Sequence, residues 1–341
     1  MTRLPLPPRS RLPLITLILL AAVLAPLFFP GPHALALGTR IVAFALLAGS
    51  YDIVLGYTGI VSFAHSAFFG LGAYGAAIAL GGSPSVPAFL GGTLGGMAAA
   101  GGFAALLTLF SLRVEAVFFA MLTLAFGRLV QIVAEEWRTV TGGTDGLTFS
   151  LPAPFRPSDM TAGLSGHELT LALAGIITLG AFFLLDRLVR SPFGSVLAAI
   201  RENPRRAQAL GYSPLLFRTI ASSIAAMTAA LAGALFALSL RYVNPDVALS
   251  FSLMVDVLLM GVIGGLGTLA GPVIGAVVLV FMEDGLEPLL GWLGPRLAGV
   301  PGAALLLAPE RWLLWLGLLF VSMVYFAPAG LFGLWRGKSR S

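Results

Sequence analysis

The sequence predicts an all-α membrane protein, a polytopic bundle of about ten transmembrane helices. Apolar residues make up 58% of the 341 residues and charged residues only 10%, whereas a soluble domain carries about 25% charged residues. The 42 glycines favour closely packed helices, because small residues let helix backbones approach each other in lipid. The chain contains no cysteine, which excludes a disulfide framework and a thiolate metal site.

Apolar stretches long enough for a membrane crossing follow one another along the chain. A crossing needs about 20 mainly apolar residues, because each helical residue advances about 1.5 Å through about 30 Å of hydrocarbon. The stretches are 12–30, 39–55, 66–81, 86–110, 114–137, 168–188, 215–240, 252–266, 271–285 and 311–328. We expect them to form a single transmembrane domain over residues 1–341. Re-entrant segments are an alternative at 55–66 and 264–272.

We interpret the first stretch as a spanning helix and not as a removable signal peptide. It follows the arginines of the N-terminus, as a signal peptide would, and Ala34-Leu35-Ala36 resembles a cleavage site. However, the apolar run is longer than a typical signal core, and further membrane helices follow at once.

The basic residues between the spans predict the orientation of the chain. They form three clusters: Arg3, Arg9 and Arg11; the arginines of the connection 187–218; and Arg336, Lys338 and Arg340. Ten crossings place all three clusters on one side, which the positive-inside rule assigns to the cytoplasm. We therefore predict cytoplasmic termini, a cytoplasmic loop at 189–219 and an external loop at 138–167. The net charge of +5 reflects this orientation and does not indicate nucleic-acid binding.

The loop 189–219 contains three prolines, each preceded by a residue that caps helices. The pairs are Ser191-Pro192, Asn203-Pro204 and Ser213-Pro214. Proline fits the first turn of a helix, where its missing N–H costs nothing, and Gly211 stands where a glycine ends a helix. We predict helices over 192–202 and 204–210, and a third that begins near Pro214. Such a loop is suited either to docking a partner protein or to contact with anionic lipid.

Glycines, hydroxyls and one histidine interrupt the apolar sequence at Leu55–His65. Inside a membrane, non-helical backbone is stable only where protein or a water-filled cavity satisfies its polar groups. We therefore expect the segment to line a path through the protein, with Tyr57, Thr58, Ser62 and His65 as candidate path residues. The alternative is that Tyr57 and His65 only hold two helices together through hydrogen bonds.

Two charged side chains, Arg128 and Asp256, lie within predicted spans. A lone charge inside the membrane costs at least about 2.5–3.5 kcal/mol on insertion scales. We hypothesise that the two residues pair with each other or line a hydrated vestibule near the external surface. Separate contacts with the membrane surface or with a partner subunit are the alternative.

The sequence predicts no enzyme activity, cofactor or metal site. The segment Gly333–Ser339 ends like a phosphate-binding loop, but Phe332 stands where such a loop needs a further glycine five positions before Gly337. We therefore expect no ATP hydrolysis by this chain. The three histidines, His33, His65 and His167, lack any metal-ligand spacing.

Four segments in order along the chain carry a family resemblance. They are Leu55–Gly70, Thr141–Leu147, Arg201–Gly211 and Met260–Pro272. They resemble, respectively, the signature, the motif before the central external loop, the ATPase-binding loop and the late glycine-rich segment of branched-chain amino acid ABC permeases of the LivM-like branch. One departure is Asn203-Pro204, which stands where many ABC permeases carry two alanines.

The resemblance implies a permease subunit of a binding-protein-dependent ABC importer, which forms the translocation path for branched-chain or related small amino acids. Its implied partners are a second related permease, two cytoplasmic ABC ATPase subunits that bind the ATP, an external solute-binding protein and the lipid of a prokaryotic plasma (inner) membrane. The residues implied in ATPase coupling are Arg201, Glu202, Ala207, Leu210 and Gly211. Two alternatives stay open: an ABC permease for urea or short amides, and a secondary transporter that needs no ATPase.

Overall fold

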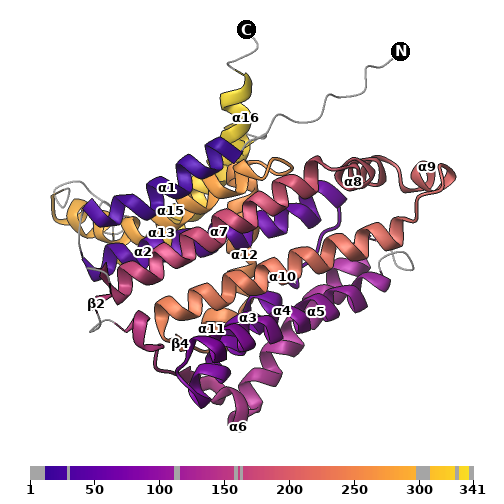
Figure 1. The fold of residues 1–341 in the computed structure, drawn as a ribbon. Coiled ribbons are helices and arrows are strands. Elements are labelled where there is room, and N and C mark those ends of the chain that lie inside the picture. The colour runs from indigo at the N-terminus through magenta and orange to yellow at the C-terminus, as the bar shows by residue number, and fades with distance from the viewer. Residues whose placement is uncertain are drawn as a thin grey trace.

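The computed structural model describes residues 12–28, 31–110, 116–156, 160–161, 164–296, 308–326 and 330–337, and it is helical almost throughout (Figure 1). Its long helices are α1 (Leu12–Phe28), α2 (Pro32–Asp52), α3 (His65–Gly82), α4 (Val86–Leu109), α5 (Ala116–Glu136), α7 (Gly166–Arg190), α10 (Pro214–Leu240), α12 (Phe251–Gly264), α13 (Ala270–Arg296) and α15 (Trp312–Phe326). Each predicted span overlaps one of these helices.

Short elements connect the long helices. The helical ones are α6 (Arg138–Thr141), α8 (Pro192–Glu202), α9 (Pro204–Ala209), α11 (Pro245–Ala248) and α16 (Gly330–Gly337). Two antiparallel strand pairs join β1 (Leu147–Thr148) to β4 (Tyr242–Val243) and β2 (Met160–Thr161) to β3 (Leu164–Ser165).

The predicted class, a polytopic helical membrane bundle, is confirmed. Seven helical stretches in the described part of the chain are long and apolar enough to cross a membrane. The number of ten crossings and their direction stay predictions. Of the basic residues that predict the direction, Arg3, Arg9, Arg11, Lys338 and Arg340 lie outside the described residues.

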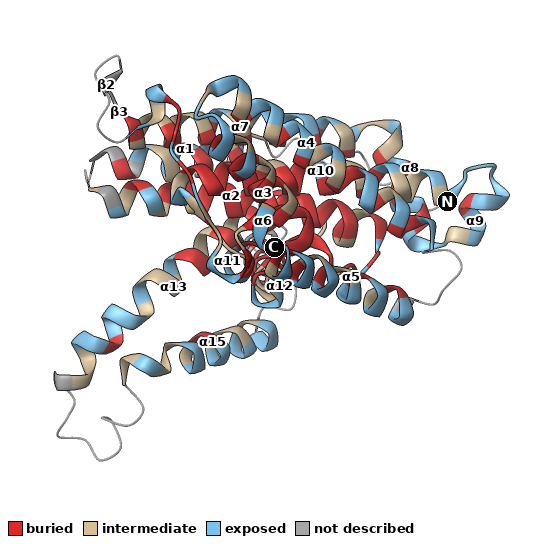
Figure 2. Cartoon of the chain, turned by 90° about the horizontal axis from the view of Figure 1, so that it is seen from below, coloured by how far each residue is buried: buried red, intermediate tan, exposed pale blue. Residues whose placement is uncertain are grey.

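The bundle has a buried centre and two distinct ends. Helix α2 is the central element. The most apolar 18 residues of the stretch His33–Thr58, which contains most of α2, are 89% buried, whereas the corresponding value for the stretch that contains α15 is 13%. Figure 2 shows the buried residues concentrated in α2, α3 and α10. In Figure 1, α8 and α9 lie at one end of the bundle, and β4, α6 and α11 lie towards the other.

Small residues bring α3, α4 and α10 into close backbone contact. A Cβ on Gly72 of α3 would overlap the backbone of α10, and Gly92 and Gly96 of α4 pack on the backbone of α3. Gly91 and Gly95, on the neighbouring ridge of α4, face open space. Among the described residues, only one of the two glycine ridges of α4 therefore serves helix packing.

The predicted helices of the loop 189–219 are present as α8, α9 and the start of α10. The Asn203 side chain caps α9 by accepting a 3.0 Å hydrogen bond from the Arg206 N–H, and Gly211 follows the helix with φ of 91°. The expected cap of α8 is wrong in one respect. The hydroxyl of Ser191 donates to the Leu188 carbonyl (2.6 Å) at the end of α7 and does not cap α8.

Candidate functional site

Two glycine-containing segments interrupt the apolar sequence, at 55–66 and at 264–272, and we call them the first and the second break. They meet at the end of α2. Asp52 is the last residue of α2 and is fully buried. Its carboxylate accepts hydrogen bonds from the backbone N–H groups of Gly267 (2.5 Å), Thr268 (3.1 Å) and Leu269 (2.9 Å). These three residues belong to the connection 265–269 between α12 and α13. Asp52, which lies just before the first break, therefore binds the second.

The local structure explains why this connection needs a carboxylate. The N–H groups that precede and begin a helix have no partner within that helix, and they attract negative charge. Gly267, Thr268 and Leu269 directly precede α13, which begins at Ala270. The Asp52 carboxylate supplies acceptors for all three N–H groups in a buried place, where unpaired groups are costly.

Beyond Asp52 the chain leaves regular α-helical geometry. Residues Ile53–Thr58 form a turn of π-helix, which Gly59 ends with φ of 72°. The Thr58 hydroxyl donates a 2.6 Å hydrogen bond to the Val54 carbonyl within this turn. Such π-helical turns occur frequently at functional sites.

Helix α8 reaches this junction through Arg201. The Arg201 guanidinium donates a hydrogen bond to the carbonyl of Gly56, which lies in the π-helical turn. Gly56 itself has no room for a side chain, because a Cβ would overlap the Asp52 carboxylate and the amide nitrogen of Gly267. Two side chains, Asp52 and Arg201, thus connect three segments that are distant in sequence: the turn after α2, the α12–α13 connection and α8.

The residues that the resemblance assigns to ATPase coupling fall into two groups. Arg201 is an exposed residue whose guanidinium reaches the core as described, and Ala207 is buried in a small cluster with Val196 and Ile200. Glu202, Leu210 and Gly211 are exposed, and Leu210 is 71% accessible although it is apolar. The apolar side chain of Leu210 therefore lies exposed directly after the end of α9.

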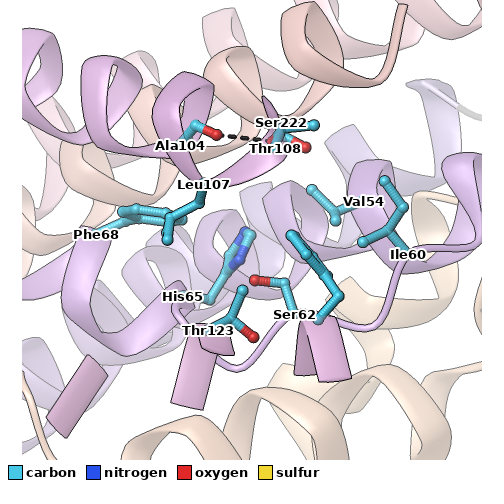
Figure 3. A pocket seen from close by; sticks show the side chains of 11 residues that line it. Val54, Ile60, Ser62, His65, Phe68, Ala104, Leu107, Thr108, Thr123 and Ser222 are labelled. Carbon is cyan, nitrogen blue, oxygen red and sulfur yellow. Dashed lines mark hydrogen bonds between the residues drawn. The ribbon is translucent and has the colours of Figure 1, made fainter. Parts of the chain in front are cut away.

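Of the four candidate path residues, the structure brings Ser62 and His65 together on a narrow cavity of about 10 Å³. Figure 3 shows His65, Ser62 and Thr123 gathered on one side of it. A volume of about 10–15 Å³ is what a single water molecule requires, so this passage is closed to larger solutes here. Tyr57 and Thr58 do not line the cavity.

Two buried side chains near this cavity carry polar atoms that have no hydrogen-bond partner among the described residues. These atoms are the two ring nitrogens of His65 and the hydroxyl of Tyr51. Their rings are in edge-to-face contact with centroids 4.9 Å apart. An unsatisfied buried polar group costs about 1–3 kcal/mol, which makes a purely structural role in this conformation unfavourable.

The structure does not form the predicted pair between Arg128 and Asp256. Arg128 lies 3.5 Å from the carboxylate of Glu135, two turns further along α5, and its side chain is 57% exposed. The charged neighbours that act on Asp256 are Glu283 and Arg40. Each of the two residues therefore has a different charged environment.

Sequence reasoning overlooked Asp52 and Tyr51. A signal for Asp52 was present, because it is a lone carboxylate inside the predicted span 39–55, and an ionisable residue in a span is a functional candidate by default. Tyr51 carried no comparable signal, since a tyrosine in an apolar stretch is common in helix packing. No group of three or more histidine, cysteine or acidic side chains among the described residues is arranged to hold a metal ion.

Comparisons with known proteins find the same family that the four motifs resemble. The sequence model of the family described as branched-chain amino acid transport system / permease component matches residues 34–324. The high-affinity branched-chain amino acid transport system permease protein LivM of Escherichia coli is 27% identical over 307 residues, which are 81% of this chain and 68% of that protein. LivM of Salmonella typhimurium is 28% identical over 292 residues, or 78% of this chain and 66% of that protein.

A more distant relative is the probable branched-chain amino acid transport permease protein LivM of Methanocaldococcus jannaschii. It is 28% identical over 217 residues, which are 61% of this chain and 57% of that protein. The chain thus spans about two thirds or less of the length of these relatives. No solved structure matches it significantly.

Proposed function

The chain belongs to the family of branched-chain amino acid transport permease components, and on this premise we propose that it forms the translocation path of a binding-protein-dependent ABC importer. The substrates are branched-chain or related small amino acids. A second related permease completes the membrane unit, two cytoplasmic ATPases supply the energy, and an external binding protein delivers the substrate. In this assignment the termini and the α8–α9 loop face the cytoplasm of a prokaryote.

The junction of Asp52, Arg201 and the two breaks carries this proposal. A loop that only lay on lipid would need no bond to the transmembrane core, yet Arg201 of α8 binds the Gly56 carbonyl. From Gly56 the chain of contacts continues through Asp52 to the α12–α13 connection. An ATPase that moves α8 would therefore displace both breaks together.

The exposed face of the loop is the proposed ATPase contact. Glu202, Leu210 and Gly211 are accessible there, and an apolar side chain surrounded by polar ones is typical of an interface anchor. This surface favours an ABC permease over a secondary transporter, because a secondary transporter needs no docking site for an ATPase.

The narrow cavity at Ser62 and His65 is the proposed closed point of the path. Opening it exposes the ring nitrogens of His65 and the hydroxyl of Tyr51 to water or substrate, which supplies the partners that they lack in the closed state. The closed conformation thus holds polar groups ready for a hydrated path.

Reconstitution tests the proposal. The chain is assembled with its permease, ATPase and binding-protein partners in liposomes, and uptake of radiolabelled leucine is measured with ATP on the ATPase side. We expect uptake that needs both ATP and the binding protein, with competition by isoleucine and valine but not by urea. Uphill leucine uptake by liposomes that contain the chain without ATPases would contradict the proposal.

A further inference from the structure

A second, larger cavity lies at the opposite end of α2. It is a groove of about 450 Å³ between α2, the end of α10, α11 and the start of α12, with Asp284 of α13 at its edge. Arg40 in this groove is twelve residues before Asp52, or about 18 Å along the helix at 1.5 Å per residue. The volume of the groove falls in the range of about 300–1,000 Å³ that is usual for small-molecule sites.

The groove offers a cation with free hydrogen-bond donors. The Arg40 guanidinium binds the Glu283 carboxylate of α13 and lies 5.1 Å from the centroid of the Phe44 ring. A guanidinium has five N–H donors in a planar fork. Among the described residues Arg40 forms a hydrogen bond with Glu283 alone, which leaves donors with which it can bind a second carboxylate.

Carboxylates and apolar side chains share the same lining. Asp246 and Asp256 line the groove, and Asp284 also lines it but is bonded to His33 at 3.2 Å. The apolar part of the lining includes three buried side chains from three different helices. They are Phe44, Phe236 and Leu253, and the ring centroids of the two phenylalanines are 5.4 Å apart.

We propose that this groove is an outer binding site for a zwitterionic amino acid with an aliphatic side chain. Asp256 and Asp246 bind its ammonium group, Arg40 binds its carboxylate, and the aliphatic side chain rests on Phe44 and Phe236. The proposal deepens the proposed function and rests on it for the substrate class. It places the first contact of the substrate with this subunit at the end of α2 that lies opposite the Asp52 junction.

The absence of cysteine from the chain provides a site-specific test. In the assembled importer, a Ser252→Cys variant places one thiol in the groove, and a Ser83→Cys variant places one on an exposed turn after α3, outside the groove. The rate of labelling by a water-soluble methanethiosulfonate is measured with and without L-leucine. We expect leucine to slow labelling several-fold in the Ser252→Cys variant and not at all in the Ser83→Cys variant.

Ligand analogues and second substitutions separate the charges. We expect 3-methylbutylamine, which lacks the carboxylate, and 4-methylpentanoate, which lacks the ammonium group, to protect much less than leucine. Adding Arg40→Gln or Asp256→Asn to Ser252→Cys removes the protection by leucine, while labelling without ligand shows that the groove is still accessible.

The inference is overturned by any of three results in the Ser252→Cys importer: no labelling, labelling that leucine does not slow, or protection by the amine equal to that by leucine. Leucine uptake by the same liposomes tests the proposed function separately. Uptake without protection contradicts the groove alone, whereas protection without uptake supports the groove and contradicts the importer assignment.

Discussion

The carboxylate of Asp52 accepts a 2.9 Å hydrogen bond from the backbone N–H of Leu269, although 217 residues separate the two in the chain. Together with the bonds from Gly267 and Thr268, this contact places an acidic side chain fully inside the bundle. A carboxylate is stable in such a place only when hydrogen bonds satisfy its oxygens. The same bonds hold the α12–α13 connection against the end of α2.

Replacing Asp52 tests this clamp. An Asp52→Asn substitution turns one acceptor oxygen into a donor NH₂ that faces backbone N–H groups, so at least one of the three bonds is lost. Bonds to charged groups contribute about 1.5–3 kcal/mol each, and we expect a corresponding loss of thermal stability in detergent and loss of ATP-driven uptake. Asp145→Asn, at an exposed turn, is the control and keeps both properties. Normal uptake and stability in Asp52→Asn would show that the clamp is dispensable.

Gly56 provides a steric test of the same junction. A methyl group in Gly56→Ala would overlap the Asp52 carboxylate and the Gly267 amide, so we expect a strong loss of uptake and of stability. Gly95→Ala is the matched control, because its methyl group meets open space and alanine favours a helix by about 0.5–1 kcal/mol over glycine. Both variants are compared by thermal unfolding and leucine uptake. Equal behaviour of the two would contradict the close packing at Gly56.

Arg201 is the side chain that connects α8 to the junction. In Arg201→Gln the loop keeps its helices and its exposed face, but the shorter, uncharged glutamine side chain does not reach the Gly56 carbonyl. We expect ATPase subunits to bind and hydrolyse ATP while leucine uptake falls, which is uncoupling of the two activities. Arg205→Gln removes an exposed arginine from the same loop and leaves coupling intact. An identical ratio of uptake to ATP hydrolysis in both variants would refute the coupling role.

Hydropathy and helix caps predicted most of the architecture, because membrane thickness fixes the length of a span and Asn-Pro or Ser-Pro fixes a helix start. They predicted α8 and α9 and located both breaks. They did not predict that the breaks meet, since a bond between Asp52 and Gly267 depends on how distant helices pack and leaves no periodic trace in the sequence. Arg128 shows the opposite case: its charged neighbour Glu135 lies on the same helix, whereas the hypothesised partner Asp256 lies on a different helix.

Leu210 tests the proposed ATPase contact. A Leu210→Glu substitution places a charge at the exposed end of α9 without disturbing a buried side chain. Interface anchors contribute about 2 kcal/mol or more, so we expect at least about a 30-fold weaker association with the ATPase subunits, measured by titration in nanodiscs. Gln208→Glu adds the same charge at another exposed position of α9 and has a smaller effect. Unchanged binding in Leu210→Glu would exclude this face as the docking site.

Replacing His65 tests whether this side chain lines the path or only supports packing. Its two ring nitrogens have no hydrogen-bond partner among the described residues and its ring packs against Tyr51 and Phe68. In His65→Phe an aromatic ring stays in place and the cost of the unsatisfied nitrogens, about 1–3 kcal/mol, disappears. We therefore expect thermal stability to be equal or higher while leucine uptake falls, because the open path loses a polar group. His167→Phe, at the start of α7 and away from the cavity, controls for loss of a histidine. A drop in stability with unchanged uptake would instead make His65 a structural residue.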